Sequence, residues 1–157
     1  MLNEYMDRAV QLAAANVQDG GRPFGAVLVK NGKIVAEGVN ELHKIHDVSG
    51  HAEMLVIRQI QKEYETDDLS SFALYASGHP CPMCLTAMYF AGIKEAYYCQ
   101  SLEDAKEAGL SGKLNLYEEI GKDNNDRYLK MSRIPLDTTQ INPMKLWQEQ
   151  EAAKDPS

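Results

Sequence analysis

Two short motifs in this sequence combine residues that bind zinc with a residue that moves protons. The first is a His-Ala-Glu segment over residues 51–53, and the second is a Pro-Cys-Pro-Met-Cys segment over residues 80–84. His51, Cys81 and Cys84 are typical zinc ligands, and three protein ligands leave a tetrahedral ion one open position for water, as in catalytic sites. Glu53 is placed to take a proton from that water and pass it on. The pattern predicts one zinc per chain and hydrolytic chemistry, with Glu53 as the catalytic residue.

Each motif also has a second interpretation. His-x-Glu pairs recur by chance on protein surfaces, and Cys-x-x-Cys alone is also half of a structural zinc finger or a redox pair. A structural zinc needs a fourth ligand, for which the candidates are His43, His46, His79 and Cys99. His79 is cramped against Cys81, and Cys99 falls in an apolar strand where a buried, inert thiol is expected. The other two histidines lie in a polar loop. We therefore favour a catalytic zinc and keep a non-catalytic zinc-binding module as the alternative.

Composition limits the classes of partner. The 157 residues are 44% hydrophobic, with 16 basic against 23 acidic residues, a formal charge of −7 and a pI near 5.1. Such a chain fits one compact domain, and its acidity disfavours nucleic acid as a partner. A small neutral substrate fits better. We expect no leader peptide at the N-terminus and no membrane span. Three cysteines form no disulfide framework, so a reducing compartment, the cytoplasm, is expected.

The pattern of apolar residues predicts the elements that position the motifs. The turn dipeptide Asn31-Gly32 predicts a hairpin, and Asn3 and Ser49 are cap candidates for the helices that follow them. We expect helices over 3–18, 51–64, 82–91, 102–108 and 143–153, strands over 25–29, 33–39, 72–76, 95–99 and 134–136, and a surface loop over 121–127. Helices and strands in this order predict an α/β fold with a mixed sheet.

Both metal-binding motifs are therefore expected to begin helices. The N-terminus of a helix presents free N–H groups and positive partial charge, which lowers the pKa of a thiol and favours cysteine as a metal ligand. His51 is expected to open one helix, and Cys81 and Cys84 to straddle the first turn of the next.

The motifs resemble those of the cytidine-deaminase-like superfamily, and within it bacterial guanine deaminases. The resemblance runs over nearly the whole chain, through residues 22–27, 37–40, 51–53, 80–84, 107–109 and 142–147. It implies a three-layer α/β/α sandwich around a five-stranded mixed sheet, and a homodimer in which the segment 142–157 is exchanged between subunits. It also implies that Asn40 hydrogen-bonds the base, that Phe24 stacks on the ring and that the Ala52 backbone makes a further contact. From chemistry alone, Asn40 is equally a turn residue and Phe24 an ordinary packing aromatic.

The chain departs from the guanine deaminase pattern at four places. The acidic pair after Gly109 is replaced by the segment Leu-Ser-Gly-Lys over 110–113, and the tryptophan after Tyr89 is Phe90, which we place among the substrate contacts. The residue two before the first cysteine is His79 rather than glutamate, and the C-terminal aromatic is missing. The departures leave the reaction intact and bear on the base. Guanine to xanthine plus ammonia is the leading expectation, followed by isoguanine, adenine, cytosine, a pterin or an amino-triazine, and then by tRNA adenosine deamination.

Overall fold

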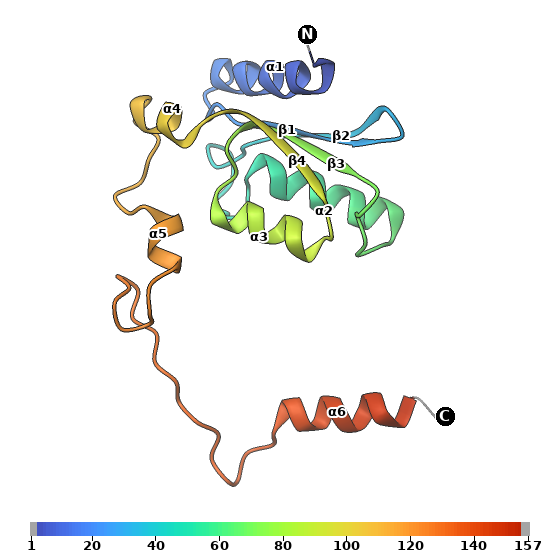
Figure 1. Cartoon of the computed structure of the whole chain (residues 1–157), viewed down its shortest axis with the longest axis vertical. Coiled ribbons are helices and arrows are strands. Elements are labelled where there is room, and N and C mark those ends of the chain that lie inside the picture. Colours follow the sequence, from blue (N-terminus) through green and yellow to red (C-terminus); the bar gives the residue numbers. More distant parts are fainter. Residues whose placement is uncertain (1–2, 155–157) are drawn as a thin grey trace. The chain divides into compact units, whose positions relative to one another are not determined.

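A computed structural model describes residues 3–154, so the last three residues of the segment 142–157 lie outside it. The chain divides into two compact units, one up to Glu119 and one from Ile120 onward. The elements, labelled in Figure 1, are α1 (Glu4–Gln18), β1 (Gly25–Lys30), β2 (Lys33–Val39), α2 (Ala52–Tyr64), β3 (Ala73–Gly78), α3 (Pro82–Phe90), β4 (Glu95–Gln100), α4 (Leu102–Glu107), α5 (Leu116–Ile120) and α6 (Pro143–Lys154).

The first helix and the hairpin confirm the predictions made from local sequence. The Asn3 side chain accepts hydrogen bonds of 3.0 Å from the backbone N–H groups of Tyr5 and Met6, so it caps α1 as expected. Asn31 and Gly32 both have positive φ, at 50° and 75°, as a two-residue hairpin turn requires. β1 and β2 pair antiparallel on either side of this turn.

The sheet is mixed, as predicted. Its strand order is β2-β1-β3-β4, with β1 antiparallel to both neighbours and β3 parallel to β4. In the described residues it has four strands, so the expected five-stranded sheet is wrong. The predicted fifth strand, 134–136, has no regular structure, and Ile134 is 92% exposed. The segment is short, and Pro135 at its centre has no N–H to donate to a neighbouring strand.

Helices cover both faces of the sheet in the unit up to Glu119. In Figure 1, α1 lies on one face and α2 and α3 lie on the other. A side chain at Gly25 would come within 2.5 Å of the Ala9 carbonyl oxygen, so α1 sits close against the start of β1. The core between the sheet, α2 and α3 contains fully buried aliphatic side chains, among them Leu28, Val56, Ile60 and Leu74.

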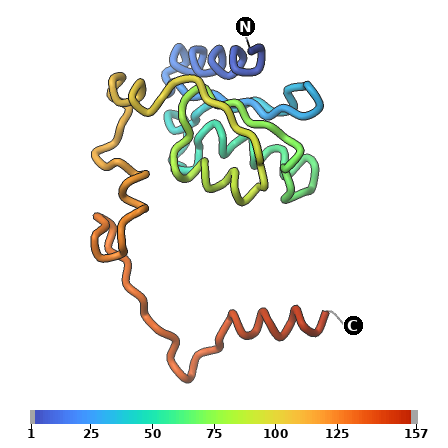
Figure 2. Tube along the Cα trace, viewed as in Figure 1, coloured from blue at the N-terminus to red at the C-terminus, as the bar shows by residue number. Residues whose placement is uncertain are grey.

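Strand directions bring three segments to one edge of this sheet. β3 ends at Gly78, directly before the cysteine motif, and β1 runs antiparallel to β3 so that its start lies at the same end. β2 ends there too, because Val39 pairs with Gly25. The tube in Figure 2 follows the chain from β2 through α2 and back into β3. Residues just before β1, just after β2 and just after β3 therefore meet at this edge.

Other elements differ from expectation in detail. α2 begins one residue later than predicted, with His51 as its N-cap, and Ser49 donates to Asp47 Oδ1 at 2.6 Å instead of capping the helix. Cys99 is exposed rather than buried, because every residue of the edge strand β4 is exposed. α5 was not predicted. No helix in the described part of the chain is long and apolar enough to cross a membrane.

In its described residues, 120–154, the unit from Ile120 onward has one full helix. α6 begins at Pro143 as predicted, and the Asn142 side chain accepts a hydrogen bond of 3.0 Å from the backbone N–H of Lys145. Residues 121–127 form turns and bends, as the loop prediction required. Large apolar side chains of this unit are exposed, including Ile134, Ile141, Met144 and Trp147.

Candidate active site

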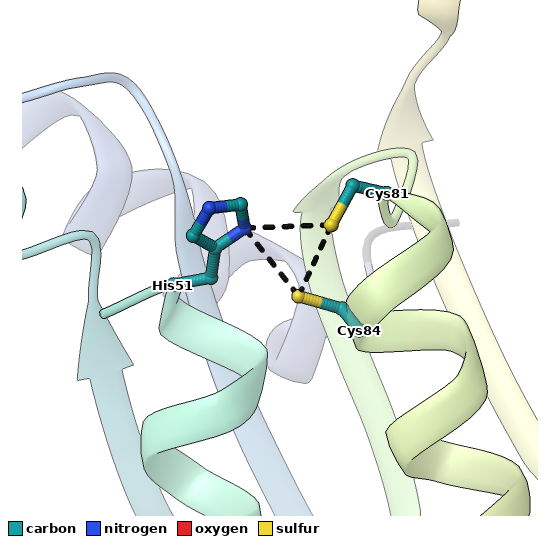
Figure 3. A group of neighbouring side chains, drawn as sticks. All are labelled: His51, Cys81 and Cys84. Carbon is teal, nitrogen blue, oxygen red and sulfur yellow. Dashed lines mark hydrogen bonds between the residues drawn. The ribbon is translucent and has the colours of Figure 1, made fainter. Parts of the chain in front are cut away.

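The structure brings His51, Cys81 and Cys84 together at the edge where the three segments meet. His51 precedes α2, Cys81 precedes α3, and Cys84 lies in the first turn of α3 (Figure 3). His51 Nδ1 is 3.5 Å from each of the two sulfur atoms, and the sulfurs are 3.6 Å apart. Among the described residues, this is the one group of histidine, cysteine and acidic side chains with metal-ligand geometry.

These separations fit a tetrahedral zinc. Bond lengths of about 2.3 Å for Zn–S and about 2.0–2.1 Å for Zn–N place two tetrahedral ligands about 3.8 Å apart for sulfur and sulfur, and about 3.6 Å apart for sulfur and nitrogen. The distances of 3.6 Å and 3.5 Å agree with both values. The donor set therefore has the composition and the spacing to hold zinc, with a fourth corner left over.

The electrostatics of the group favour negative charge on sulfur. The pKa of Cys81 falls to about 4, because its thiolate accepts one hydrogen bond from Cys84 and another from His51. The pKa of Cys84 is raised, because its thiol donates to Cys81 and is buried. The hydrogen bond to Cys81 raises the pKa of His51. A metal cation that displaces these protons would find three ligands already oriented.

Glu53 lies beside the same group without belonging to it. Its side chain comes from the first turn of α2 and is only 6% exposed. Burial raises the pKa of this carboxyl, while hydrogen bonds to its own backbone N–H and to Cys84 oppose the rise. A carboxyl whose pKa is raised in this way is suited to accept and return a proton near neutral pH.

Asn40 is held in one orientation of its amide group, with its donor free. Its Oδ1 accepts a hydrogen bond of 3.0 Å from the backbone N–H of Leu42, and this N–H can only donate, so the orientation of the amide is fixed. Its backbone N–H donates to Phe24, and its carbonyl accepts from Asn16. Asn40 is buried, and within residues 3–154 its Nδ2 has no protein acceptor. A ligand that offers an acceptor can therefore pair with this free donor.

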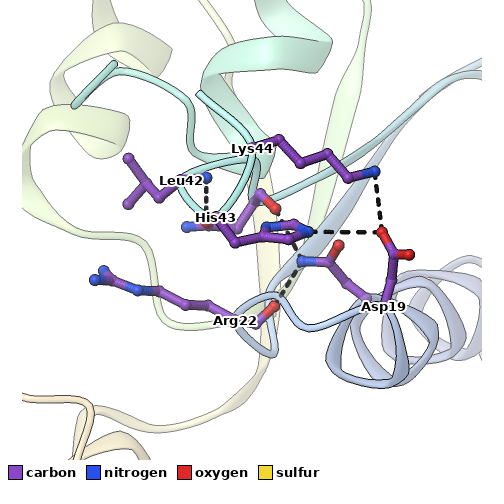
Figure 4. A network of polar contacts seen from close by, with 7 residues as sticks. Asp19, Arg22, Leu42, His43 and Lys44 are labelled. Atoms are coloured by element: carbon purple, nitrogen blue, oxygen red, sulfur yellow. Dashed lines mark hydrogen bonds and ion pairs between the residues drawn. The ribbon is translucent and has the colours of Figure 1, made fainter. Parts of the chain in front are cut away.

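A polar network fixes the loops that carry Asn40 and Phe24 (Figure 4). Asn16 Nδ2 donates to the carbonyls of Arg22 and Asn40 at 2.8 and 2.9 Å, which ties the two loops together. Asp19 Oδ2 forms an ion pair of 3.0 Å with Lys44 Nζ and lies 3.6 Å from His43 Nε2. His43, one of the alternative zinc ligands, therefore faces a carboxylate away from the metal-ligand group, and so does not supply a fourth ligand in this structure.

The remaining predicted substrate contacts are placed unequally. The ring of Phe24 lies against Gly78, where an added Cβ would be 3.0 Å from it, so the ring sits at the same edge as the cysteine motif. Ala52 is buried at the first position of α2, where its N–H has no partner within the helix. Phe90 is at the far end of α3 and 87% exposed, six residues past Cys84 and so about 9 Å further along the helix. The structure does not bring Phe90 to the group.

Sequence reasoning missed one residue beside the site. Tyr117, on α5, donates a hydrogen bond to the carbonyl oxygen of Pro80. Burial, followed by the negative charges of Cys81, Cys84 and Glu53, raises the pKa of Tyr117 to about 12. No motif marks this tyrosine, because it comes from a five-residue helix far from the cysteines in sequence. Ser111 and Lys113, which replace the expected acids, are exposed in the segment before α5.

Comparison with known proteins shows the family of this chain. The cytidine and deoxycytidylate deaminase zinc-binding region matches residues 1–100, which include the whole ligand group. The chain belongs to this family. Members carry out hydrolytic deamination, so the chain is a zinc-binding deaminase by family and an enzyme by class.

Two relatives of this chain act on different substrates by their names. The chain is 40% identical to guanine deaminase of Bacillus subtilis over 144 residues, which cover 91% of each protein. It is 30% identical to a tRNA-specific adenosine deaminase of Aquifex aeolicus over 115 residues, covering 73% of this chain and 75% of that one. The guanine deaminase therefore matches a longer part of this chain at higher identity.

Two solved structures of guanine deaminases resemble this chain to different degrees. The crystal structure of Bacillus subtilis guanine deaminase superposes with a TM-score of 0.86, at 39% identity and with 95% of both chains covered. A guanine deaminase from Nitrosomonas europaea superposes with a TM-score of 0.63, at 27% identity, covering 67% of this chain and 62% of that one. The fold of this chain is thus similar to that of the Bacillus enzyme over the matched part.

Proposed function

We propose that this deaminase converts a free nucleobase, with guanine to xanthine plus ammonia as the leading reaction. The observation that carries the proposal is the triangle of His51, Cys81 and Cys84 at tetrahedral spacing with the buried Glu53 beside it. The likeness to guanine deaminase over 91% of the chain supports guanine as the base. The formal charge of −7 favours a small substrate over tRNA.

In this proposal His51, Cys81 and Cys84 hold zinc, which when bound supplies the acidification of water that makes a nucleophile available at neutral pH. Glu53 Oε accepts the proton that water loses as its oxygen bonds to C2 of guanine. The carboxyl returns this first proton to a ring nitrogen, then takes the second proton from the new hydroxyl group on C2 and passes it to the 2-amino group. The bond between C2 and the amino nitrogen breaks, ammonia leaves, and the oxygen stays on C2 as a carbonyl. Burial of Glu53 keeps bulk water from competing for this proton.

The substrate contacts follow from the fixed donor of Asn40. Guanine carries acceptors at its 6-oxo group and at ring nitrogens, and Asn40 Nδ2 supplies a donor for one of them. Phe24 would stack on the ring, because its own ring is braced on the flat surface that Gly78 leaves. We also retain the Ala52 N–H as a contact to the base, and Phe90 as a contact that one chain by itself does not bring to the site.

The replacement of acids by Ser111 and Lys113 is the reason to test other bases beside guanine. Guanine offers N–H donors at N1 and its 2-amino group, and an unpaired donor in a buried site discriminates strongly against a substrate. The test is ammonia release by purified protein from guanine, adenine, isoguanine, cytosine, pterins and amino-triazines. Release from guanine alone supports the leading reaction, and release from another base moves the assignment to that base. Zinc-loaded protein that releases none would favour the non-catalytic zinc-binding module.

We propose further that residues 1–157 act as one deaminase domain within a homodimer, and that the segment 142–157 is exchanged between subunits. The support is the exposure of apolar side chains from Ile120 onward, such as Ile134, Ile141 and Trp147, which need a surface to cover them. A dimer by light scattering at micromolar concentration is expected, and Trp147→Ala should shift it toward monomer. A fully active monomer would contradict the assembly.

Its compartment, we propose, is the cytoplasm. All three cysteines have free thiols, and Cys99 is exposed on β4. An exposed thiol persists most readily in a reducing compartment.

A further inference from the structure

The carbonyl group directly before the first thiolate receives two hydrogen bonds from side chains. Tyr117 donates its hydroxyl hydrogen to the Pro80 carbonyl oxygen, and His79 Nδ1 lies 2.8 Å from the same oxygen. A carbonyl oxygen only accepts, so His79 must carry its hydrogen on Nδ1. Because the oxygen has two lone pairs, both donors can bond it at once. Pro80 itself is buried, and Cys81 is the next residue.

His79 is in turn held on several sides. Its ring packs edge-on against Tyr98 on β4, at 4.7 Å between ring centroids, and against Tyr117, at 5.5 Å. Its backbone N–H donates to the carbonyl of Gln100 at 2.8 Å, which extends the parallel pairing of β3 and β4 by one bond. The imidazole is therefore fixed in position by the end of the sheet on one side and by α5 on the other.

We propose that Tyr117 and His79 are positioning residues that hold the peptide between Pro80 and Cys81, and so aim the Cys81 sulfur at the metal. Cys81 needs such help, because as N-cap of α3 its side chain makes no cap hydrogen bond, and its backbone precedes the regular helix. Rotation of the peptide in front of it would swing Sγ away from His51 Nδ1 and Cys84 Sγ. This inference rests on the proposed function in that these three residues hold zinc.

The side chains of Tyr117 and His79 can each bond the Pro80 carbonyl without the other. Loss of one leaves the carbonyl bonded by the other, whereas loss of both frees the peptide and leaves a buried acceptor unsatisfied. Groups that orient metal ligands typically change metal affinity by about 10–100-fold when they are removed. Tyr117 lies outside residues 1–100, the part that matches the family, so this support is added by a later segment of the chain.

Four variants separate the contributions of these side chains. Tyr117→Phe removes one donor, His79→Phe removes the other but keeps an aromatic ring, and the double variant removes both. His79→Asn keeps a donor near the position of Nδ1 and should restore much of what His79→Phe loses. Tyr98→Phe is the matched control, because the Tyr98 ring touches His79 but, within residues 3–154, its hydroxyl makes no hydrogen bond.

The decisive measurement is the rate at which the zinc protein loses metal to a chelator, together with the sulfur-to-cobalt charge-transfer absorption of the Co²⁺ protein. We expect either donor variant to lose zinc about 10-fold faster and the double variant about 100-fold faster, with an altered cobalt spectrum. Tyr98→Phe and His79→Asn should stay close to wild type. In metal-free protein, Cys81 should be alkylated faster in the double variant than in wild type, while the alkylation of Cys99 stays unchanged. Thermal unfolding and circular dichroism identify any variant that has not folded.

Three results would overturn the inference. The first is a folded double variant with wild-type zinc loss and cobalt spectrum, and the second is an equal effect of Tyr98→Phe. The third is a fall in kcat with unchanged zinc loss, which would mean that Tyr117 acts on the substrate directly. Wild-type protein that binds no zinc would instead refute the proposed function, and the alkylation of Cys81 would still test the positioning of its sulfur.

Discussion

The helices of this deaminase begin in two different ways. α1 and α4 are capped by their N-cap side chains: Asn3 accepts from two backbone N–H groups, and Ser101 forms a reciprocal capping box with Asp104. α2 and α3, which carry the metal ligands, begin at His51 and Cys81, and neither side chain makes a cap hydrogen bond. The side chains that would have capped these helices face each other across the site instead. α2 and α3 therefore lack the stabilisation of a side-chain cap at the two positions where the site needs a metal ligand.

The largest effect is expected from removing a metal ligand that lies within α3. Cys84→Ser should leave well under about one tenth of a zinc per chain and abolish turnover, because two ligands cannot hold the ion in the way that three do. Elemental analysis and ammonia release check this. Cys99→Ser, which changes an exposed thiol on β4, should leave both unchanged. Full zinc content in Cys84→Ser would mean that the first turn of α3 does not serve the metal.

The next effect concerns the first turn of α2. Glu53→Gln should reduce kcat by about 10²–10⁴-fold, because the amide keeps the shape of the side chain but cannot accept the proton. Zinc content should stay at the wild-type value. If the variant instead lost zinc, Glu53 would be a metal ligand. The starts of α2 and α3 would then supply metal ligands and no separate proton acceptor.

A smaller effect would sharpen the contrast between the two kinds of helix start. Ser101→Ala should lower the free energy of unfolding by about 1 kcal/mol, since it removes a cap. Cys81→Ser, compared with Cys81→Ala in metal-free protein, should raise it by up to about 1 kcal/mol, since serine is a good N-cap. Denaturant unfolding of the four metal-free proteins, wild type included, measures both differences. Equal stability of Cys81→Ser and Cys81→Ala would show that the start of α3 cannot be capped even when it is released from the site.

The smallest effect is a pH dependence at the start of α2 in metal-free protein. Burial raises the pKa of Glu53 in the folded state above its ordinary value of 4.5. The folded state therefore binds this proton more tightly than the unfolded state, and the resulting stabilisation is complete below pH 4.5 and lost as pH rises through the folded pKa. Glu53→Gln should thus raise the melting temperature at neutral pH, and the gain should shrink toward pH 4.5. Glu107→Gln, at the exposed end of α4, is the control, and a gain independent of pH would contradict the assignment.

Local sequence signals predicted the first unit well. Asn31-Gly32 predicted the hairpin, Asn3 the start of α1, and the two motifs the three side chains that meet at one edge of the sheet. Ser49 was predicted as the cap because serine is a good N-cap by type, whereas the N-cap is His51, two residues later, and α2 begins at Ala52. The preference of serine for N-cap positions could not reveal that His51 is the N-cap of α2.

Other features lay beyond local signals because they depend on distant contacts. Tyr117 acquires its role from a carbonyl 37 residues earlier in the chain, and no spacing rule connects the two. The segment 134–136 has the apolar residues of a strand, but a strand also needs a neighbour whose N–H and C=O groups it can pair with. The orientation of Asn40 is likewise fixed by the N–H of Leu42, which a residue type alone does not disclose.

The hydrogen bond from His79 to Gln100 has a consequence for how the enzyme is made in the cell. His79 can brace the peptide in front of Cys81 only when β4 has paired with β3 up to Gln100, and Tyr117, the second donor, comes later in the chain. At about 5–20 residues per second, a ribosome needs about 1–4 s to add the residues from Cys81 to Gln100. During this interval the nascent chain already carries its two thiols but cannot yet hold them in place. We therefore expect the ion to be captured late in biosynthesis, after β4 has paired with β3.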